Sequence, residues 1–233
     1  MRISTPNQEW GDLLAQNIAT YSVGRPKRGQ FVHAYLDAHA ESPESILELG
    51  AFSGKDSLYL QQRYPSCRFI AVDKDSDVAL HLKRLGLQAC VADALRLPFS
   101  DNSFDVTFQS GLLILFSNEE ARRIIEEQVR VTRRVAFVFA HNQRGLPDRL
   151  GAFIKRTVLG KEIYHFRRYT VEELTEILRS LGLNGLALYH DNALRNAIGR
   201  TVPSLTPLIE RLGLHKSPYF MNELVLIVWK SAT

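Results

Sequence analysis

Residues 45–57 constrain the fold of this chain more than any other stretch of its sequence. They begin with an apolar run of strand length and end in a helical pattern that starts at Ser57. Gly50 and Gly54 lie between the two, and glycines allow positive φ angles or a close approach of the backbone to a ligand. A strand that passes through glycines into a helix presents free backbone N–H groups. The stretch therefore predicts a ligand-binding turn after a buried strand.

The alternation of apolar runs with helical patterns continues along the chain and predicts the fold class. Capping boxes at Ser117–Glu120 and Thr170–Glu173 mark the starts of two of the helices. We expect an α/β fold, a doubly wound, Rossmann-like seven-stranded sheet that is mostly parallel with an antiparallel edge strand, and helices on both faces. The expected strands are residues 46–49, 68–73, 88–93, 106–110, 135–140, 183–189 and 223–229.

Composition excludes several classes of protein. Hydrophobic residues make up 45% of the chain and charged residues 23%, as in ordinary soluble domains. No apolar run approaches the roughly 20 residues of a membrane span, and the start lacks the apolar core of a secretory signal. Cys67 and Cys90 provide neither a disulfide framework nor metal-ligand spacing, so we expect no metal site and a cytoplasmic location. The net charge of +4 is too small to indicate nucleic-acid binding by itself.

Three motifs in order resemble those of a known family. Residues 48–54, Glu-Leu-Gly-Ala-Phe-Ser-Gly, resemble the first motif of class I S-adenosylmethionine-dependent methyltransferases, an acidic residue followed by G-x-G-x-G, with Phe52 in place of the middle glycine. Residues 91–99 and 103–106 resemble the second and third motifs. The resemblance covers roughly residues 45–141 and is closest to the small-molecule group that includes the quinone and sterol methyltransferases.

The resemblance implies S-adenosyl-L-methionine as the cofactor and assigns residues to its amino acid end. Gly50, Ala51 and Gly54 would pass their backbone close to it, and Glu48 would position its ammonium group. These residues surround the turn that the sequence pattern already indicates as a ligand site.

The nucleoside end of the cofactor would lie farther along the strand edge. Asp73 ends the second apolar run, where an acidic residue can accept both hydroxyls of a ribose. By resemblance, Lys74 would flank the adenine, Asp93 would accept from its amino group, and Ala94 would donate its backbone N–H. The end of the fourth strand would also lie beside the cofactor, at Gln109, Ser110 and Gly111.

Methyl transfer from a sulfonium depends mainly on the placement of the acceptor, and a general base helps only where the acceptor must lose a proton. His141 follows the fifth strand and is the candidate base. Two insertions are typical sites of an acceptor pocket in the resembled family. The candidate acceptor-binding residues are Phe153, Ile154, Tyr164, His165 and Tyr169.

The length of 233 residues favours a single domain. We expect its parts to be an N-terminal helical segment (1–44), a cofactor-binding half (45–141) and a substrate-side half (142–233) with insertions at 142–169 and 191–221.

The leading hypothesis is methyl transfer to an O, N or C atom of a small or lipid-like metabolite. One alternative is an RNA or other nucleic-acid methyltransferase, because cations gather between residues 144 and 168, but no base-nitrogen motif or RNA-binding module accompanies them. A catalytically inactive S-adenosylmethionine-binding protein is another, for which Phe52 is the hint. We expect a small-molecule acceptor, no nucleic-acid partner and, through the basic amphipathic residues 146–161, at most weak contact with an anionic membrane. The oligomeric state stays open.

Overall fold

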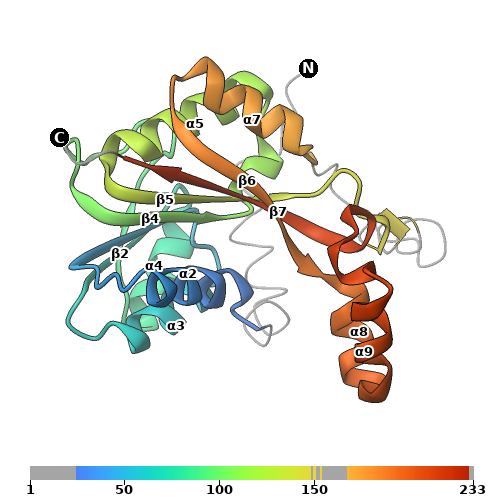
Figure 1. The fold of residues 1–233 in the computed structure, drawn as a ribbon. Coiled ribbons are helices and arrows are strands. Elements are labelled where there is room, and N and C mark those ends of the chain that lie inside the picture. The colour runs from blue at the N-terminus through green and yellow to red at the C-terminus, as the bar shows by residue number, and fades with distance from the viewer. Residues whose placement is uncertain (1–24, 148, 151–152, 154–166, 231–233) are drawn as a thin grey trace.

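One seven-stranded sheet forms the centre of the molecule (Figure 1). The computed structural model describes residues 25–147, 149–150, 153 and 167–230. Its strands are β1 (Ser45–Leu49), β2 (Arg68–Asp73), β3 (Gln88–Val91), β4 (Phe104–Ser110), β5 (Thr132–His141), β6 (Asn184–Asn192) and β7 (Met221–Trp229). They lie in the order β3-β2-β1-β4-β5-β7-β6.

The sheet is parallel from β3 to β5, and its antiparallel pairing lies toward one edge, where β7 runs against both β5 and β6. This confirms the predicted fold class, and all seven predicted strands are present. The order reverses between β1 and β4, so the carboxyl ends of these two strands form the crevice in which open α/β sheets bind ligands.

Helices cover both faces of the sheet (Figure 1). Helices α2 (Lys27–Ala38), α3 (Lys55–Arg63) and α4 (Ser76–Arg84) pack on one face, and α5 (Asn118–Val131) and α7 (Val171–Ser180) pack on the other. The first face carries the phenylalanines Phe108, Phe137 and Phe139, all fully buried. Burying each such side chain contributes about 1.5–3 kcal/mol relative to leaving it exposed.

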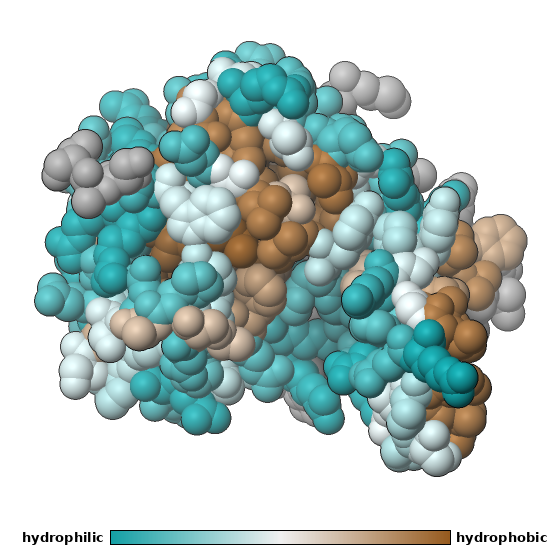
Figure 2. All heavy atoms as spheres, in the orientation of Figure 1, coloured by the Kyte–Doolittle hydropathy of each residue, from teal (hydrophilic) through white to brown (hydrophobic). Residues whose placement is uncertain are grey.

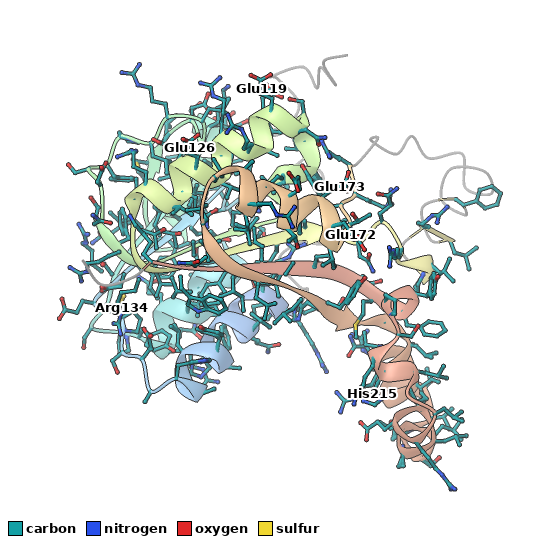
Figure 3. All side chains as sticks on the ribbon, turned by 45° about the horizontal axis from the view of Figure 1, so that its top comes forward. Glu119, Glu126, Arg134, Glu172, Glu173 and His215 are labelled. Atoms are coloured by element: carbon teal, nitrogen blue, oxygen red, sulfur yellow. The ribbon has the colours of Figure 1, made fainter. Side chains whose placement is uncertain are left out.

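The two helices on the second face begin at the capping boxes that the sequence predicts. The hydroxyl of Ser117 accepts from the N–H of Glu120, and the hydroxyl of Thr170 accepts from the N–H of Glu173. Glu119 and Glu126 lie on the outer side of α5 (Figure 3), while its apolar side chains enter the core. Amphipathic spacing therefore decides how this helix packs.

The segment between β6 and β7 projects from the sheet as an arm, which we call the α8–α9 arm (Figure 1). It contains α8 (Ala193–Thr201), the 3₁₀ turn η2 (Pro203–Leu205) and α9 (Thr206–Arg211), and it returns to β7 through η3 (Leu214–Lys216) and η4 (Pro218–Phe220). A further 3₁₀ turn, η1 (Leu112–Leu115), follows β4. Across the described ranges, no helix has the length and apolar character that a membrane span requires.

Candidate functional site

The turn after β1 takes the backbone conformation that its glycines allow. Gly50 has φ 63° and Gly54 has φ 69°, both in the left-handed region. A Cβ on Gly50 would also lie 2.8 Å from a methyl carbon of Leu112. The N–H of Gly54 donates to the carbonyl of Ala51 at 2.8 Å, and the N–H of Ala51 donates to Val72 of β2 at 3.1 Å. The turn is thus held against the neighbouring strand.

Phe52 stands where the first motif of the family usually has its middle glycine, and it also adopts a positive φ, 43°. This conformation costs a non-glycine residue roughly 1–2 kcal/mol. Two contacts offset the cost: the side chain packs against the cluster formed with Leu82 of α4, and the N–H donates to Asp73 Oδ2 at 3.1 Å. The replacement of the glycine therefore leaves a left-handed turn in place.

Asp73, at the carboxyl end of β2, binds the backbone of the turn after β1 and of the loop after β2. Its Oδ2 accepts from Phe52, and its Oδ1 accepts from the N–H of Asp75 at 3.1 Å. Burial raises the pKa of this carboxyl above its ordinary value. A carboxylate has about four lone-pair positions on its two oxygens, so these contacts leave room for a ligand hydroxyl to donate to it.

Asp93 follows β3, the neighbour of β2, and so lies at the same sheet edge as Asp73. Its Oδ1 accepts from the N–H of Leu95 at 3.0 Å, and Lys74 Nζ lies 3.0 Å from its Oδ2. Burial alone would raise the pKa of Asp93, but the Leu95 N–H and the Lys74 ammonium hold it below its ordinary value. The adjacent Ala94 is buried. The predicted adenine-side residues thus lie together.

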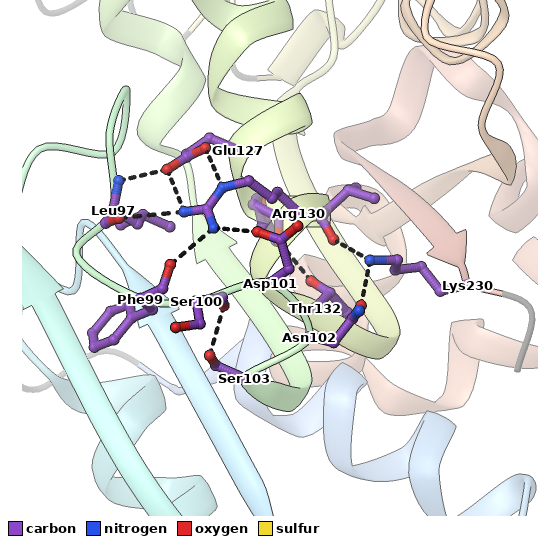
Figure 4. Close-up of polar contacts among 12 residues, drawn as sticks. Leu97, Phe99, Ser100, Asp101, Asn102, Ser103, Glu127, Arg130, Thr132 and Lys230 are labelled. Atoms are coloured by element: carbon purple, nitrogen blue, oxygen red, sulfur yellow. Dashed lines mark hydrogen bonds and ion pairs between the residues drawn. The ribbon is translucent and has the colours of Figure 1, made fainter. Parts of the chain in front are cut away.

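The loop after Asp93 is held at its far end by Arg130 of α5 (Figure 4). The guanidinium donates to the carbonyl of Phe99 at 2.8 Å and to Asp101 at 2.7 Å, and it pairs with Glu127 at 2.8 Å. Glu127 in turn accepts from the N–H of Leu97 at 2.7 Å. These contacts fix the connection between the end of β3 and the start of β4.

Glu48 lies inside the molecule at the end of β1. It is 1% exposed, and the hydroxyl of Ser57 donates to its Oε2. Burial, together with the nearby Asp56 carboxylate, raises the pKa of Glu48 to about 8. A cationic group placed beside Glu48 would favour its charged form.

Gln109 and Gly111 at the end of β4 take different roles. The amide of Gln109 is used within the protein: Nε2 donates to the carbonyl of Phe139 at 3.1 Å, and Oε1 accepts from the N–H of Leu112 at 2.7 Å. Any contact of Gln109 with a cofactor would therefore have to come from its backbone. Gly111 has φ 75°, and a Cβ there would lie 3.3 Å from the guanidinium of Arg28. Ser110, between them, is 3.5 Å from Asp56 Oδ2.

Arg28 and Glu223 form a buried ion pair that the sequence does not single out. The guanidinium donates to both carboxylate oxygens, through Nε at 3.2 Å and a terminal nitrogen at 2.5 Å. Burial would raise the pKa of Glu223, but Arg28 keeps it below its ordinary value. A second pair, from Lys27 to Asp191 at 2.7 Å, ties the start of α2 to the end of β6.

His141 ends β5 and lies opposite Glu223 in the β5–β7 register. His190 of β6 lies opposite Glu223 on its other side. The two histidines therefore flank the carboxylate on the face that α2 covers. Burial lowers the pKa of His190, and its Nε2 is buried without a hydrogen-bond partner in the described structure.

A cavity of about 520 Å³ opens beside this pair, between the amino ends of α2 and α3 and the α8–α9 arm. It lies at the end of the crevice away from Asp73 and Asp93, because β7 and α8 are on the opposite side of β1 in the sheet order. Its lining, as far as the described residues show it, consists of Arg25, Lys27, Arg28, Lys55, Asp56, Arg200 and Glu223.

The two predicted acceptor residues that the structure describes, Phe153 and Tyr169, differ in their exposure. Tyr169 is fully buried and its hydroxyl donates to the carbonyl of Leu113 at 3.1 Å, so it belongs to the core and no substrate can reach it. Phe153 is 61% exposed. Ile154, Tyr164 and His165 lie outside the described residues, as do most of the first insertion and of the N-terminal helical segment.

The fold and the site together define a class of protein. A left-handed glycine turn follows β1, and carboxylates follow β2 and β3, at the switch point where doubly wound sheets bind ligands. Residues 46–134 match a family model described as a methyltransferase domain. The chain therefore contains a methyltransferase domain over these residues and has the fold of the class I S-adenosylmethionine-dependent methyltransferases, a family whose cofactor is S-adenosyl-L-methionine.

Solved structures show the same fold. The plantazolicin methyltransferase BpumL, solved with S-adenosylhomocysteine, aligns with a TM-score of 0.63 and 15% identity over 97% of this chain and 94% of its own. The magnesium protoporphyrin IX methyltransferase of Synechocystis, also solved with S-adenosylhomocysteine, aligns with a TM-score of 0.60 and 14% identity over 88% and 83%. An uncharacterized protein of Haemophilus influenzae is 25% identical over 107 residues, which is 42% of each chain, so the match spans under half of that relative.

Proposed function

We propose that this protein transfers the methyl group of S-adenosylmethionine to an O, N or C atom of a small or lipid-like metabolite. The observation that carries the proposal is one continuous edge of the sheet: the glycine turn, Asp73 and Asp93 lie on one side of the β1–β4 crevice, and the cavity beside Glu223 lies on the other. A cofactor laid along the carboxylates would point its amino acid end toward that cavity.

The cofactor brings an activated methyl group, and the residues of this chain bind and orient the two reactants. Glu48 would face the cofactor ammonium, Asp73 the ribose hydroxyls and Asp93 the adenine amino group. Lys74, which is paired with Asp93, would lie beside the adenine. The backbone of Gly50, Ala51, Gly54, Ala94, Ser110 and Gly111 would line the remaining surface.

His141 is the proposed general base for acceptors that must lose a proton. It ends β5 next to Glu223, whose negative charge would stabilise the imidazolium that forms. Acceptors that are already nucleophilic would need only placement. Phe153 and Ile154 are proposed to contribute apolar contact from the first insertion.

Transfer of a tritiated methyl group tests this function. The purified protein would be incubated with labelled S-adenosylmethionine and either a fractionated extract of small metabolites or total RNA. We expect the label to appear in the small-molecule fraction. For an acceptor that must lose a proton, the His141→Ala variant should transfer less label. Label in RNA would overturn the assignment of the acceptor class.

The replacement of the middle motif glycine by Phe52 motivates one second candidate, a protein that binds the cofactor without transferring its methyl group. Calorimetric titration with S-adenosylhomocysteine, together with the transfer assay, distinguishes such a binding protein from a methyltransferase. Binding with no transfer to any fraction would support this candidate, whereas no binding would exclude both.

A further inference from the structure

The side chains that line the cavity beside Glu223 carry more positive charge than the nearby ion pairs neutralise. Figure 2 shows hydrophilic side chains in the hollow between the body of the molecule and the α8–α9 arm. Five of the described lining residues are cationic and two are acidic. Its volume of about 520 Å³ falls within the range of small-molecule sites, about 300–1,000 Å³.

Two of the cations are neutralised inside the protein. Arg28 is held by both oxygens of Glu223, and Lys27 is held by both oxygens of Asp191 at 2.8 and 2.7 Å. These pairs join α2 to the ends of β7 and β6 and form the wall of the cavity.

The other three cations have no such partner. Within the described chain, Arg25, Lys55 and Arg200 form no ion pair and no side-chain hydrogen bond. The remaining carboxylate, Asp56, is turned away toward protein groups: its Oδ1 accepts from the N–H of Gly29 at 2.9 Å. Burial also raises the pKa of Asp56 above its ordinary value.

We propose that this cavity binds an acidic group, a carboxylate or phosphate, of the methyl acceptor, with Arg200, Lys55 and Arg25 supplying the charge. The proposal rests on the proposed function and specifies the acceptor as an anionic small molecule. Cations in a partly enclosed pocket bind such groups through charge-assisted hydrogen bonds. Arg200 comes from the α8–α9 arm, so the arm takes part in choosing the acceptor.

The position of Arg200 indicates that the bound acidic group belongs to the acceptor and not to the amino acid end of the cofactor. The cofactor-side residues follow β1 to β4, whereas Arg200 stands on the arm between β6 and β7, across the cavity from α3. A cofactor carboxylate beside Gly111 would meet Arg28 first, which is 3.3 Å from the position of a Cβ there.

Charge reversal on the arm tests the proposal. Inorganic pyrophosphate and citrate serve as phosphate and carboxylate probes, titrated calorimetrically at low salt into protein saturated with S-adenosylhomocysteine. Arg200→Glu is expected to weaken binding of at least one probe by about tenfold or more, since a charged hydrogen bond contributes about 1.5–3 kcal/mol. The matched control is Arg195→Glu, on the same helix but paired with Glu210 at 3.1 Å, and it should leave binding unchanged.

Further titrations identify the source of the anion. S-adenosylhomocysteine and methylthioadenosine share a nucleoside, but only the first has a carboxylate. Arg200→Glu should bind both with wild-type affinity. A selective loss of S-adenosylhomocysteine binding would assign the cavity to the cofactor and overturn the proposal.

The proposal would also be overturned if neither probe bound to the wild type, or if Arg200→Glu and Arg195→Glu lost probe affinity equally. If S-adenosylhomocysteine itself fails to bind, the proposed function fails, and the probe titrations on the unloaded protein still decide whether the cavity is an anion site. Circular dichroism checks that each variant is folded.

Discussion

Replacement of Asp73 by alanine should weaken both the turn and the cofactor site. The carboxylate accepts two backbone N–H groups, from Phe52 and Asp75, each at 3.1 Å. Leaving such donors without a partner costs about 1–2 kcal/mol each, so the free energy of unfolding should fall by about 2–4 kcal/mol. For a chain of this size that lowers Tm by roughly 5–12 °C.

The effect on the cofactor is separate. Removing a charged acceptor of the ribose hydroxyls should cost about 1.5–3 kcal/mol, a loss of roughly 10- to 150-fold in the affinity for S-adenosylmethionine. The Asp73→Asn variant keeps one acceptor oxygen, so it should lose less stability and less affinity for the cofactor. Calorimetry below the lowered Tm gives the affinity, and thermal unfolding gives the stability.

Asp75→Ala is the matched control. Asp75 also accepts two backbone N–H groups, from Asp77 at 2.8 Å and Val78 at 3.2 Å, but as the N-cap of α4. Its loss should cost about 1 kcal/mol of stability and leave cofactor affinity unchanged. A folded Asp73→Ala protein that binds S-adenosylmethionine with wild-type affinity would refute the placement of Asp73 at the ribose.

Three further predictions concern the turn, the buried carboxyl and the core. Gly50→Val should abolish cofactor binding because φ 63° strains a β-branched residue and the side chain blocks the approach of a ligand; normal calorimetric affinity would disprove the motif assignment. Glu48 has a pKa of about 8 in the fold against an ordinary 4.5, so the native state binds the extra proton between these values. Its contribution to stability is therefore fully present below about pH 4.5 and is lost as the pH rises from there through about 8. Glu48→Gln should flatten this dependence in thermal unfolding; equal slopes for both proteins would contradict it. Tyr169→Phe should lower the free energy of unfolding by about 1–2 kcal/mol through loss of the bond to Leu113, with KM for an acceptor unchanged, and a raised KM at unaltered stability would return Tyr169 to the acceptor site.

The cofactor half of the molecule could be predicted because its signals are local. Apolar runs alternate with helical patterns, and Gly50 and Gly54 mark a turn whose φ angles the structure confirms. Asp73 and Asp93 each end an apolar run, and parallel neighbouring strands bring such residues to one edge. Short-range pattern and sheet topology are sufficient for this part.

The acceptor half depends on contacts between distant segments. Arg28 and Glu223 are 195 positions apart, and their pairing requires β7 to lie beside β5 under α2. No local pattern distinguishes Arg28 from other surface cations. Glu223 could have indicated the pair, because it lies at the start of an apolar strand and a buried carboxylate there would need a partner.

Tyr169 was predicted at the acceptor site but lies in the core, and the reason is again a contact between distant segments. Its position in an insertion after His141 suggested an acceptor contact. The structure pairs Asn142 with Tyr169 in a bridge that turns the ring into the core. Such a bridge between the two ends of an insertion has no signature in the sequence.

Hydrogen exchange measured by mass spectrometry, with and without S-adenosylhomocysteine, tests most directly whether the cofactor lies along the carboxyl ends of β1 to β4. The structure predicts slower exchange in peptides that cover residues 50–54, 73–75, 93–95 and 109–112, and no change in the α8–α9 arm. Protection confined to other segments, or the same pattern in a folded Gly50→Val variant, would contradict it.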